Sequence, residues 1–313
     1  MAKTITSPEF SRNYGFWSED EQRALVESRV AIAGVGGDGF QLGLKLARMG
    51  VSQFSIADPE VFEPENVNRV EGATASSVGR DKAEVFRERV LDINPDAEVE
   101  TFLSGVTPDN VEPFMHGASL VLDESELTRP EIGTLIARRA RAQAIPDLLV
   151  MNIGFAAQVT SFAPDSAWTF ERFMGFTPET PLAEIAEVGV DLSRCLPYIP
   201  PYTDLRSLQA VQGEDGAEPA SLPSISIGVD LASAIGSAQA FLHLTSGVSN
   251  RRRSPVWAPR VAITDAYSLR TRILRAGRAS HVGHLLVAAA RDKLGKNPQG
   301  SYTLADIARR RSA

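Results

Sequence analysis

The feature that most constrains the fold of this chain is a glycine-rich loop that joins a short apolar segment to an apolar helix. Residues 28–33 predict a buried strand, because β-branched and small apolar residues dominate them. The loop at 34–39 reads Gly-Val-Gly-Gly-Asp-Gly, and residues 40–49 predict a helix. This order is typical of a nucleotide site, because glycines let backbone amides approach a phosphate and a helix N-terminus favours its charge. The residues predicted to bind phosphate are Gly34, Gly36, Gly37 and Gly39; the alternative is a tight turn without ligand.

Predicted strands and helices alternate along most of the chain, which favours an α/β fold with a Rossmann-like, doubly wound and mainly parallel sheet. Two further segments near the C-terminus predict a hairpin, and therefore an antiparallel extension of this sheet. The predicted strands are 28–33, 54–57, 98–103, 120–122, 148–151, 158–162, 260–265 and 269–274. The predicted helices are 18–28, 39–49, 79–94, 110–115, 129–144, 227–244 and 281–294.

The chain is predicted to have three parts within one domain. Residues 1–163 form a nucleotide-binding core with an N-terminal helical arm. Prolines cluster in residues 164–223, which predicts an inserted, partly mobile loop region with short helices over the site. Residues 224–313 complete the same domain with a helix, a hairpin and a tail helix.

Polar residues that suit a bound nucleotide follow the second predicted strand. Asp58 ends this strand, where a carboxylate can accept hydrogen bonds from ribose hydroxyls; the alternative is a carboxylate that caps a turn. Asn66, Arg69 and Lys82 follow within a short segment. Two cations and an amide after a ribose carboxylate suit a triphosphate better than a nicotinamide cofactor, so a dinucleotide oxidoreductase is a weaker alternative.

These residues resemble the ThiF/MoeB/HesA family of the ubiquitin-activating-enzyme (E1-like) superfamily. The resemblance covers residues 10–160 and resumes at 227–247 and 259–275, whereas 165–223 match little. The motifs that carry it are Ser11-Arg12-Asn13, Glu21-Gln22, Arg29-Val30-Ala31-Ile32-Ala33-Gly34, Ile56-Ala57-Asp58-Pro59, Asn66-Val67-Asn68-Arg69, Gly79-Arg80-Asp81-Lys82 and Asp92-Ile93-Asn94-Pro95. The resemblance implies an enzyme that uses ATP and Mg²⁺ to activate a carboxylate as an acyl-adenylate. The carboxylate would belong to the C-terminus of a ubiquitin-like carrier protein or to a small molecule.

The resemblance also assigns roles to individual residues. It implies that Arg69 and Lys82 hold the triphosphate and stabilise the leaving pyrophosphate, and that Asn66 contacts the phosphates or the acyl group. It implies Mg²⁺ ligands at Asp123 and Glu126, where relatives carry two aspartates, because Mg²⁺ prefers hard oxygen ligands. The alternative is that these two acids cap the following helix.

The resemblance further implies a two-fold homodimer in which Arg12 reaches the nucleotide site of the other subunit. The alternative is that Arg12 is an ordinary solvated cation. The helix predicted at 227–244 is expected at the interface, because small residues allow close helix approach. These small residues are Gly228, Ala232, Ala234, Gly236 and Ala238.

Two departures from the family pattern lie at the glycine loop itself. Asp38 stands inside the loop, where relatives carry a small or apolar residue, and a carboxylate there could repel a triphosphate. Phe40 follows the last glycine, where its ring could narrow the pocket. A non-catalytic or repurposed relative that serves as a binding or partner subunit is therefore the alternative function.

Composition excludes several other classes. The net charge of −7 gives no reason to expect nucleic acid as a partner. One cysteine, Cys195, permits neither an internal disulfide nor a zinc site of several cysteines, so no zinc is expected. Cys195 could be a nucleophile, but a partly buried thiol without a chemical role is the preferred interpretation. A signal peptide and a membrane span are not expected, which predicts a cytoplasmic protein.

Overall fold

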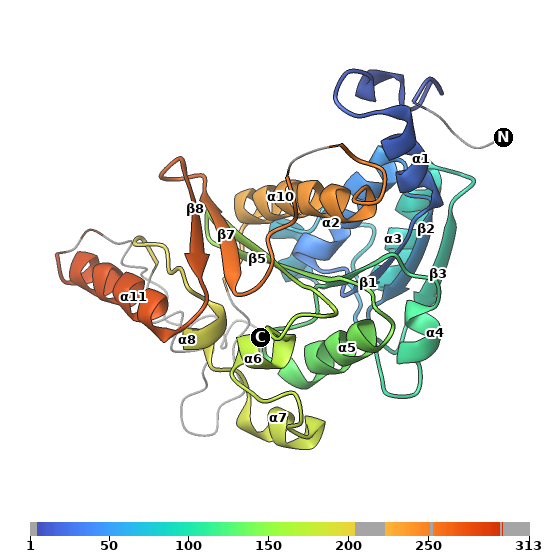
Figure 1. Cartoon of the computed structure of the whole chain (residues 1–313). Helices are drawn as coiled ribbons and strands as arrows, with labels where there is room; N and C mark the ends of the chain where they lie inside the picture. Colours follow the sequence, from blue (N-terminus) through green and yellow to red (C-terminus); the bar gives the residue numbers. More distant parts are fainter. Residues whose placement is uncertain (1–4, 204–222, 251–252, 295, 297–313) are drawn as a thin grey trace.

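A single mixed sheet forms the centre of the molecule. The structure, a computed structural model, describes residues 5–203, 223–250, 253–294 and 296. Its sheet has eight strands in the order β3-β2-β1-β4-β5-β6-β7-β8, and Figure 1 shows helices packed around it. Strands β3, β2, β1, β4 and β5 pair in parallel, whereas β5, β6, β7 and β8 pair antiparallel. The predicted fold class, a mainly parallel sheet with an antiparallel C-terminal extension, is confirmed. The strands are β1 Arg29–Ala33, β2 Gln53–Ala57, β3 Glu98–Phe102, β4 Leu120–Asp123, β5 Asp147–Ile153, β6 Ala156–Phe162, β7 Arg260–Asp265 and β8 Arg270–Arg275.

Helices cover both faces of the sheet, which explains why the central strands are apolar throughout. Alternate residues of β1 point to opposite faces: Val30 and Ile32 join the core with α2, α3 and α10, whereas Ala31 and Ala33 join the core with α4 and α5. Figure 1 shows α2 and α10 on one side of the sheet and α4 and α5 on the other. The helices are η1 Ser11–Asn13, α1 Glu19–Glu27, α2 Gly37–Met49, η2 Pro64–Asn68, α3 Lys82–Ile93, α4 Val111–Met115, α5 Pro130–Ala142, α6 Phe170–Met174, α7 Leu182–Val188, α8 Leu192–Cys195, α10 Ser226–Leu244 and α11 Arg278–Lys293.

Helix α10 crosses the sheet beside α2 and packs closely on it (Figure 1). A Cβ atom at Gly236 would lie 2.5 Å from Leu42 of α2, so the glycine permits this approach. Gly228 and Ala232 are also buried inside the chain, whereas Ala234 and Ala238 are exposed. Only the last two could serve the predicted interface without rearrangement. By length and composition α10 could span a membrane, but half of its apolar window is buried within this fold.

The described part of the predicted insertion forms a second core around α6 and α8, while α7 packs against α5. The apolar side chains of this core pack against α5 and against β5, β6 and β7. Glu171 is fully buried and accepts hydrogen bonds from Arg138 at 3.0 Å and from Arg141 at 2.9 Å, which joins α6 to α5. The short helices were predicted from the sequence, whereas much of the predicted mobile cover falls on 204–222, outside the described residues.

Candidate nucleotide-binding site

The candidate site lies at the edge of the sheet where the parallel strands end. Strand β1 lies between β2 and β4, so the chain connections diverge on its two sides. In open α/β sheets ligands bind in the crevice at such a switch point, outside the carboxyl ends of the strands. The glycine loop follows β1, Asp58 follows β2, and Asp123 ends β4. The topology therefore brings the loop and two predicted site residues to one edge.

Two glycines of the loop are required by the backbone packing. Gly34 has φ +97°, and a Cβ atom there would lie 2.2 Å from the carbonyl oxygen of Glu124. A Cβ atom at Gly39 would lie 2.1 Å from the carbonyl oxygen of Gly34. At Gly36, by contrast, an added Cβ atom would meet no atom of the described residues within 4 Å. Gly36 directly precedes α2, so the positive end of this helix lies at the open side of the loop, an arrangement that fits a phosphate.

Asp58 fixes the loop to the end of β2. Its Oδ2 accepts a hydrogen bond from the backbone N–H of Val35 at 2.8 Å, and its Oδ1 accepts one from Glu60 N–H at 2.9 Å. Burial raises the pKa of the Asp58 carboxyl group, and the positive charge of Lys82 opposes this rise. Asp58 thus supports the loop, and its contact with a ribose stays a prediction.

Lys82 is buried at the start of α3 and forms an ion pair with Glu60. Asp58, Glu60 and Lys82 therefore form one charged cluster beside the loop. Sequence reasoning did not single out Glu60. Its position two residues after Asp58, in the same turn, is the signal that could have identified it.

Asn66 lies within the short helix η2, and Arg69 is the residue at which this helix ends. Asn66 is buried, and its Oδ1 accepts a hydrogen bond from Glu63 N–H at 3.0 Å, so it stabilises the turn. Arg69 is half-buried and donates to the carbonyl of Glu65 at 3.1 Å and to Asn68 Oδ1 at 2.9 Å. Burial raises the pKa of Asp38, and the positive charge of Arg69 opposes part of this rise, so the guanidinium lies near the glycine loop.

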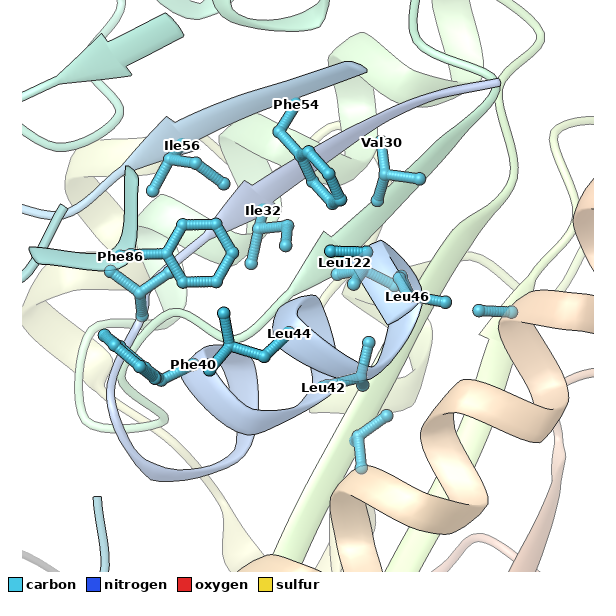
Figure 2. Packing of buried hydrophobic residues seen from close by; sticks show 14 of the residues in the cluster. Val30, Ile32, Phe40, Leu42, Leu44, Leu46, Phe54, Ile56, Phe86 and Leu122 are labelled. Atoms are coloured by element: carbon cyan, nitrogen blue, oxygen red, sulfur yellow. The ribbon is translucent and has the colours of Figure 1, made fainter. Parts of the chain in front are cut away.

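The side chains of Asp38 and Phe40 both point away from the open side of the loop. Asp38 Oδ2 accepts a hydrogen bond from Asn152 Nδ2 at 2.8 Å, and burial raises the pKa of Asp38 to about 7. Phe40 is fully buried and lies beside Phe86 in the core (Figure 2), with ring centroids 5.3 Å apart. Its ring centroid also lies 5.8 Å from that of Phe62. The Phe40 ring is therefore part of the core and does not narrow the site, contrary to the expectation from the sequence.

The two predicted Mg²⁺ ligands do not converge. Asp123 is buried with its Oδ2 directed at Gly133 of α5, where an added Cβ atom would lie 2.7 Å away. Glu126 is exposed and accepts a hydrogen bond from Thr128 at 3.0 Å. Among the described residues, no group of three or more His, Cys, Asp or Glu side chains could hold a metal ion. The Mg²⁺ assignment to Asp123 and Glu126 stays a prediction.

Glu124, which sequence reasoning missed, faces the glycine loop instead. Its Cβ and Cγ atoms would lie 3.2 Å from a Cβ atom at Gly39. Burial raises the pKa of Glu124 well above its usual value, and the negative charge of Asp38 raises it further. The alternation of side chains at the end of a strand is the signal that could have distinguished Glu124 from Asp123.

Arg12 is not brought together with the other predicted residues of its own chain. It is exposed in η1, and the neighbouring Asn13 donates to Gln22 Oε1 at 3.2 Å. Gln22 in turn donates to the carbonyl of Met49 at 2.9 Å, at the far end of α2 from the glycine loop. A helix of this length spans about 20 Å. Arg12 therefore has a position compatible either with a role in another subunit or with a simple surface role.

Cys195 is fully buried in the second core. Burial raises the pKa of its thiol to about 12, so the reactive thiolate is scarcely populated near neutral pH. This environment suits the interpretation of a thiol without a chemical role.

One family model matches most of the chain. The model of the ThiF family matches residues 10–283. The tRNA threonylcarbamoyladenosine dehydratase of Escherichia coli (strain K12) is 35% identical over 150 residues, which are 48% of this chain and 53% of that protein. The sulfur carrier protein ThiS adenylyltransferase of the same organism is 29% identical over 147 residues, 46% of this chain and 57% of that protein. The chain thus spans about half the length of the curated relatives it matches.

Solved structures show the same fold at low sequence identity. The crystal structure of E. coli MccB with ATP has a TM-score of 0.61 at 15% identity, covering 88% of this chain and 73% of that chain. The crystal structure of PaaA has a TM-score of 0.58 at 20% identity, covering 82% of this chain and 66% of that chain. At these identities the similarity extends to the fold alone.

Proposed function

The chain belongs to the ThiF family, and on this premise we propose that it is an ATP-dependent adenylyltransferase that activates a carboxylate as an acyl-adenylate. The observation that carries the proposal is the glycine loop at the switch point, open at Gly36 and held by Asp58 next to Lys82. One sequence relative is named an adenylyltransferase, and one protein of similar fold, MccB, was crystallised with ATP.

In the proposed reaction the substrate carboxylate attacks the α-phosphorus of ATP, and pyrophosphate leaves. The loop amides and the start of α2 bind phosphate oxygens, and Asp58 orients the ribose. Lys82 exchanges its pairing with Glu60 for the triphosphate, and Arg69, together with the Arg12 of the other subunit, neutralises the charge of the leaving pyrophosphate. Asn66 keeps the turn that presents Arg69 in place. Catalysis is then mostly positioning and electrostatic stabilisation.

Mg²⁺ would neutralise phosphate charge when bound, and Asp123 and Glu126 are retained as its proposed ligands. Because these side chains do not converge in the structure, no step is assigned to the metal. Glu126→Gln tests the assignment. If Glu126 is a ligand, this variant needs a higher Mg²⁺ concentration to reach half-maximal ATP binding. An unchanged Mg²⁺ concentration at half-maximal binding contradicts the role.

The acyl substrate is proposed to be the C-terminus of a ubiquitin-like carrier protein or a small-molecule carboxylate. The names of two relatives, a ThiS adenylyltransferase and a SAMP-activating enzyme, indicate small carrier proteins as substrates of those proteins. We propose that residues 164–223 shape the choice of substrate, that the chain acts as a homodimer and that it is located in the cytoplasm.

Carboxylate-dependent exchange of pyrophosphate into ATP tests the proposed function. Exchange is expected with candidate carrier proteins or with a cell extract as the carboxylate source, and Lys82→Ala should abolish it. Absence of exchange with every source, together with absence of ATP binding by calorimetry, would rule out the proposed enzyme.

A second candidate function, a non-catalytic binding or partner subunit with a degenerate nucleotide site, is favoured by one observation, the acidic residue Asp38 in the glycine loop. Calorimetry distinguishes the two candidates. Tight binding of ATP by the wild type contradicts the second function, whereas binding that is gained only in Asp38→Gly supports it.

A further inference from the structure

A continuous chain of hydrogen bonds joins the glycine loop to Arg69. Asn152 Nδ2 donates to Asp38 Oδ2 at 2.8 Å, and Ser224 Oγ donates to Asn152 Oδ1 at 2.8 Å. Asn68 Nδ2 donates to the carbonyl of Ser224 at 3.0 Å, and Arg69 Nη1 donates to Asn68 Oδ1 at 2.9 Å. Four segments that are distant in sequence are thereby connected: the start of α2, the end of β5, the residues before α10, and η2.

The position of Asn152 is fixed by the strands around it. Asn152 pairs with Ala157 across the β5–β6 ladder. The turn that follows is close-packed, because a Cβ atom at Gly228 of α10 would lie 2.1 Å from the carbonyl oxygen of Gly154. A rigid backbone therefore presents the amide of Asn152, which can donate to a carboxyl group and accept from a hydroxyl at once.

This contact decides where the acid in the loop points. Asp38 is the second residue of α2 and lies between Gly37 and Gly39, two of the glycines expected to receive phosphate. A carboxylate turned toward the open side at Gly36 would repel a triphosphate. The hydrogen bond from Asn152 instead holds the carboxyl group against the end of β5, and its other oxygen, Oδ1, is buried without a partner among the described residues.

We infer that Asn152 is a positioning residue of the nucleotide site, holding Asp38 away from the phosphate side of the loop and linking it through Ser224 and Asn68 to Arg69. The inference rests on the proposed function, because it explains how a loop that contains an acid accepts ATP. It also connects the site to Ser224, which follows the region proposed to shape substrate choice.

Exchanging the two side chains tests the inference. Asn152→Asp removes the donor and places two carboxyl groups against each other, so at pH 8 we expect ATP to bind about tenfold more weakly or worse. Asp38→Asn combined with Asn152→Asp reverses the donor and acceptor and should restore affinity to within about threefold of the wild type. The inference is overturned if Asn152→Asp binds ATP like the wild type, or if the double variant binds no better than Asn152→Asp.

A matched pair of serine variants tests the link toward Arg69. Ser224→Ala removes the hydroxyl that donates to Asn152 and should weaken ATP binding about threefold. Ser226→Ala removes an exposed hydroxyl two residues along and should leave affinity unchanged. Equal affinities in the two variants would exclude transmission through Ser224.

Thermal unfolding without nucleotide separates failure of the inference from failure of the proposed function. Asn152→Asp should lower Tm, and the double variant should recover it, whether or not ATP binds. If the wild type does not bind ATP but the Tm values follow this pattern, the proposed function fails and the hydrogen-bonded unit stands. If the double variant recovers neither Tm nor affinity, the inference fails.

Discussion

A side chain at Gly34 would meet the backbone of the protein, whereas one at Gly36 would point into open space. Substitutions at the two positions should therefore distinguish an effect on protein stability from an effect on ATP binding. Gly34→Ala places a methyl group 2.2 Å from the Glu124 carbonyl on a residue with φ +97°, so we expect a loss of about 2 kcal/mol or more in unfolding free energy. Gly36→Ala places its methyl group in open space and should change unfolding free energy by about 0.5 kcal/mol or less.

For Gly36→Ala, the affinity for ATP should change although the stability does not. Gly36→Ala should weaken ATP affinity at least about tenfold, because the methyl group occupies the side proposed for phosphate. Urea denaturation and calorimetry check the two variants. A destabilised Gly36→Ala, or one that binds ATP normally, would contradict this assignment of the open side.

The pairing of Lys82 with Glu60 is expected to compete with ATP. Glu60 is half exposed, so the pair is worth at most about 1 kcal/mol. Glu60→Gln should therefore tighten ATP binding by up to about fivefold, because Lys82 no longer leaves a carboxylate to reach phosphate. Glu100→Gln, which removes an exposed carboxylate on β3, is the control. Weaker binding in Glu60→Gln would show that Glu60 helps to place Lys82.

At the residue scale, the sequence was a good guide to which residues lie close together but a poor guide to the direction of each side chain. Asp58 and Lys82 are near each other as their spacing suggested. The sequence could not show that Phe40 enters the core or that Glu124, not Asp123, faces the loop, because both depend on the register of an element end. Asn152 carries no local signal, since its partner Asp38 is 114 positions away.

At the scale of elements, a buried histidine joins α10 to the sheet. His243 Nε2 lies 2.8 Å from Ser161 Oγ of β6, and its ring packs edge-on to Trp257 with centroids 4.9 Å apart. Burial lowers the pKa of His243 from 6.5 to about 4, so the ring is neutral in the folded protein near neutral pH.

Acidification should therefore weaken the contact between α10 and β6. Below pH 6.5 His243 is protonated in the unfolded chain, whereas in the folded chain it is protonated only near pH 4. The contribution of the neutral ring to the unfolding free energy is therefore fully present above pH 6.5 and is lost as the pH falls from 6.5 to 4. Between pH 7 and pH 5 the loss is about 2 kcal/mol.

The measurement is the difference between the wild type and His243→Gln in urea denaturation at the two pH values. Glutamine can keep the bond to Ser161 but does not titrate, so the extra loss should be absent in the variant. Buried carboxyl groups such as Asp147 titrate alike in both proteins and cancel in the difference. Equal pH dependence of the two proteins would refute the role of His243.

The sequence predicted nearly every strand and helix of the parallel half, because the apolar periods there are long and regular. Short helices were expected between the two halves, but neither their positions nor the second core that α6 and α8 form was predicted. The helices α6, α7 and α8 have four to seven residues, and they depend on tertiary contacts such as Glu171 with Arg138 and Arg141. Periodicity in such short segments carries little information.

At the scale of the whole molecule, the N-terminal arm determines whether one chain makes a complete site. Gln22 fixes the arm at the end of α2 farthest from the glycine loop, so Arg12 cannot reach its own loop without undocking. Tyr14 and Phe16 beside it are 79% and 76% exposed, which is unusual for large aromatic rings and suits a contact with another chain. The proposed homodimer would then complete each site with the Arg12 of the other subunit.

Mixing inactive variants distinguishes this arrangement from a site made by one chain. Arg12→Ala and Lys82→Ala should each lose pyrophosphate exchange. After co-refolding of equal amounts, half of the dimers are mixed, and in each of these one site has both an intact Lys82 and an intact Arg12 from the partner. About one quarter of wild-type exchange activity should therefore return.

Arg69→Ala mixed with Lys82→Ala is the control and should stay inactive, because both changes lie in the same half of the site. If the mixture of Arg12→Ala and Lys82→Ala stays inactive although light scattering shows dimers, Arg12 does not cross to the partner. A monomer by light scattering would refute the shared site altogether.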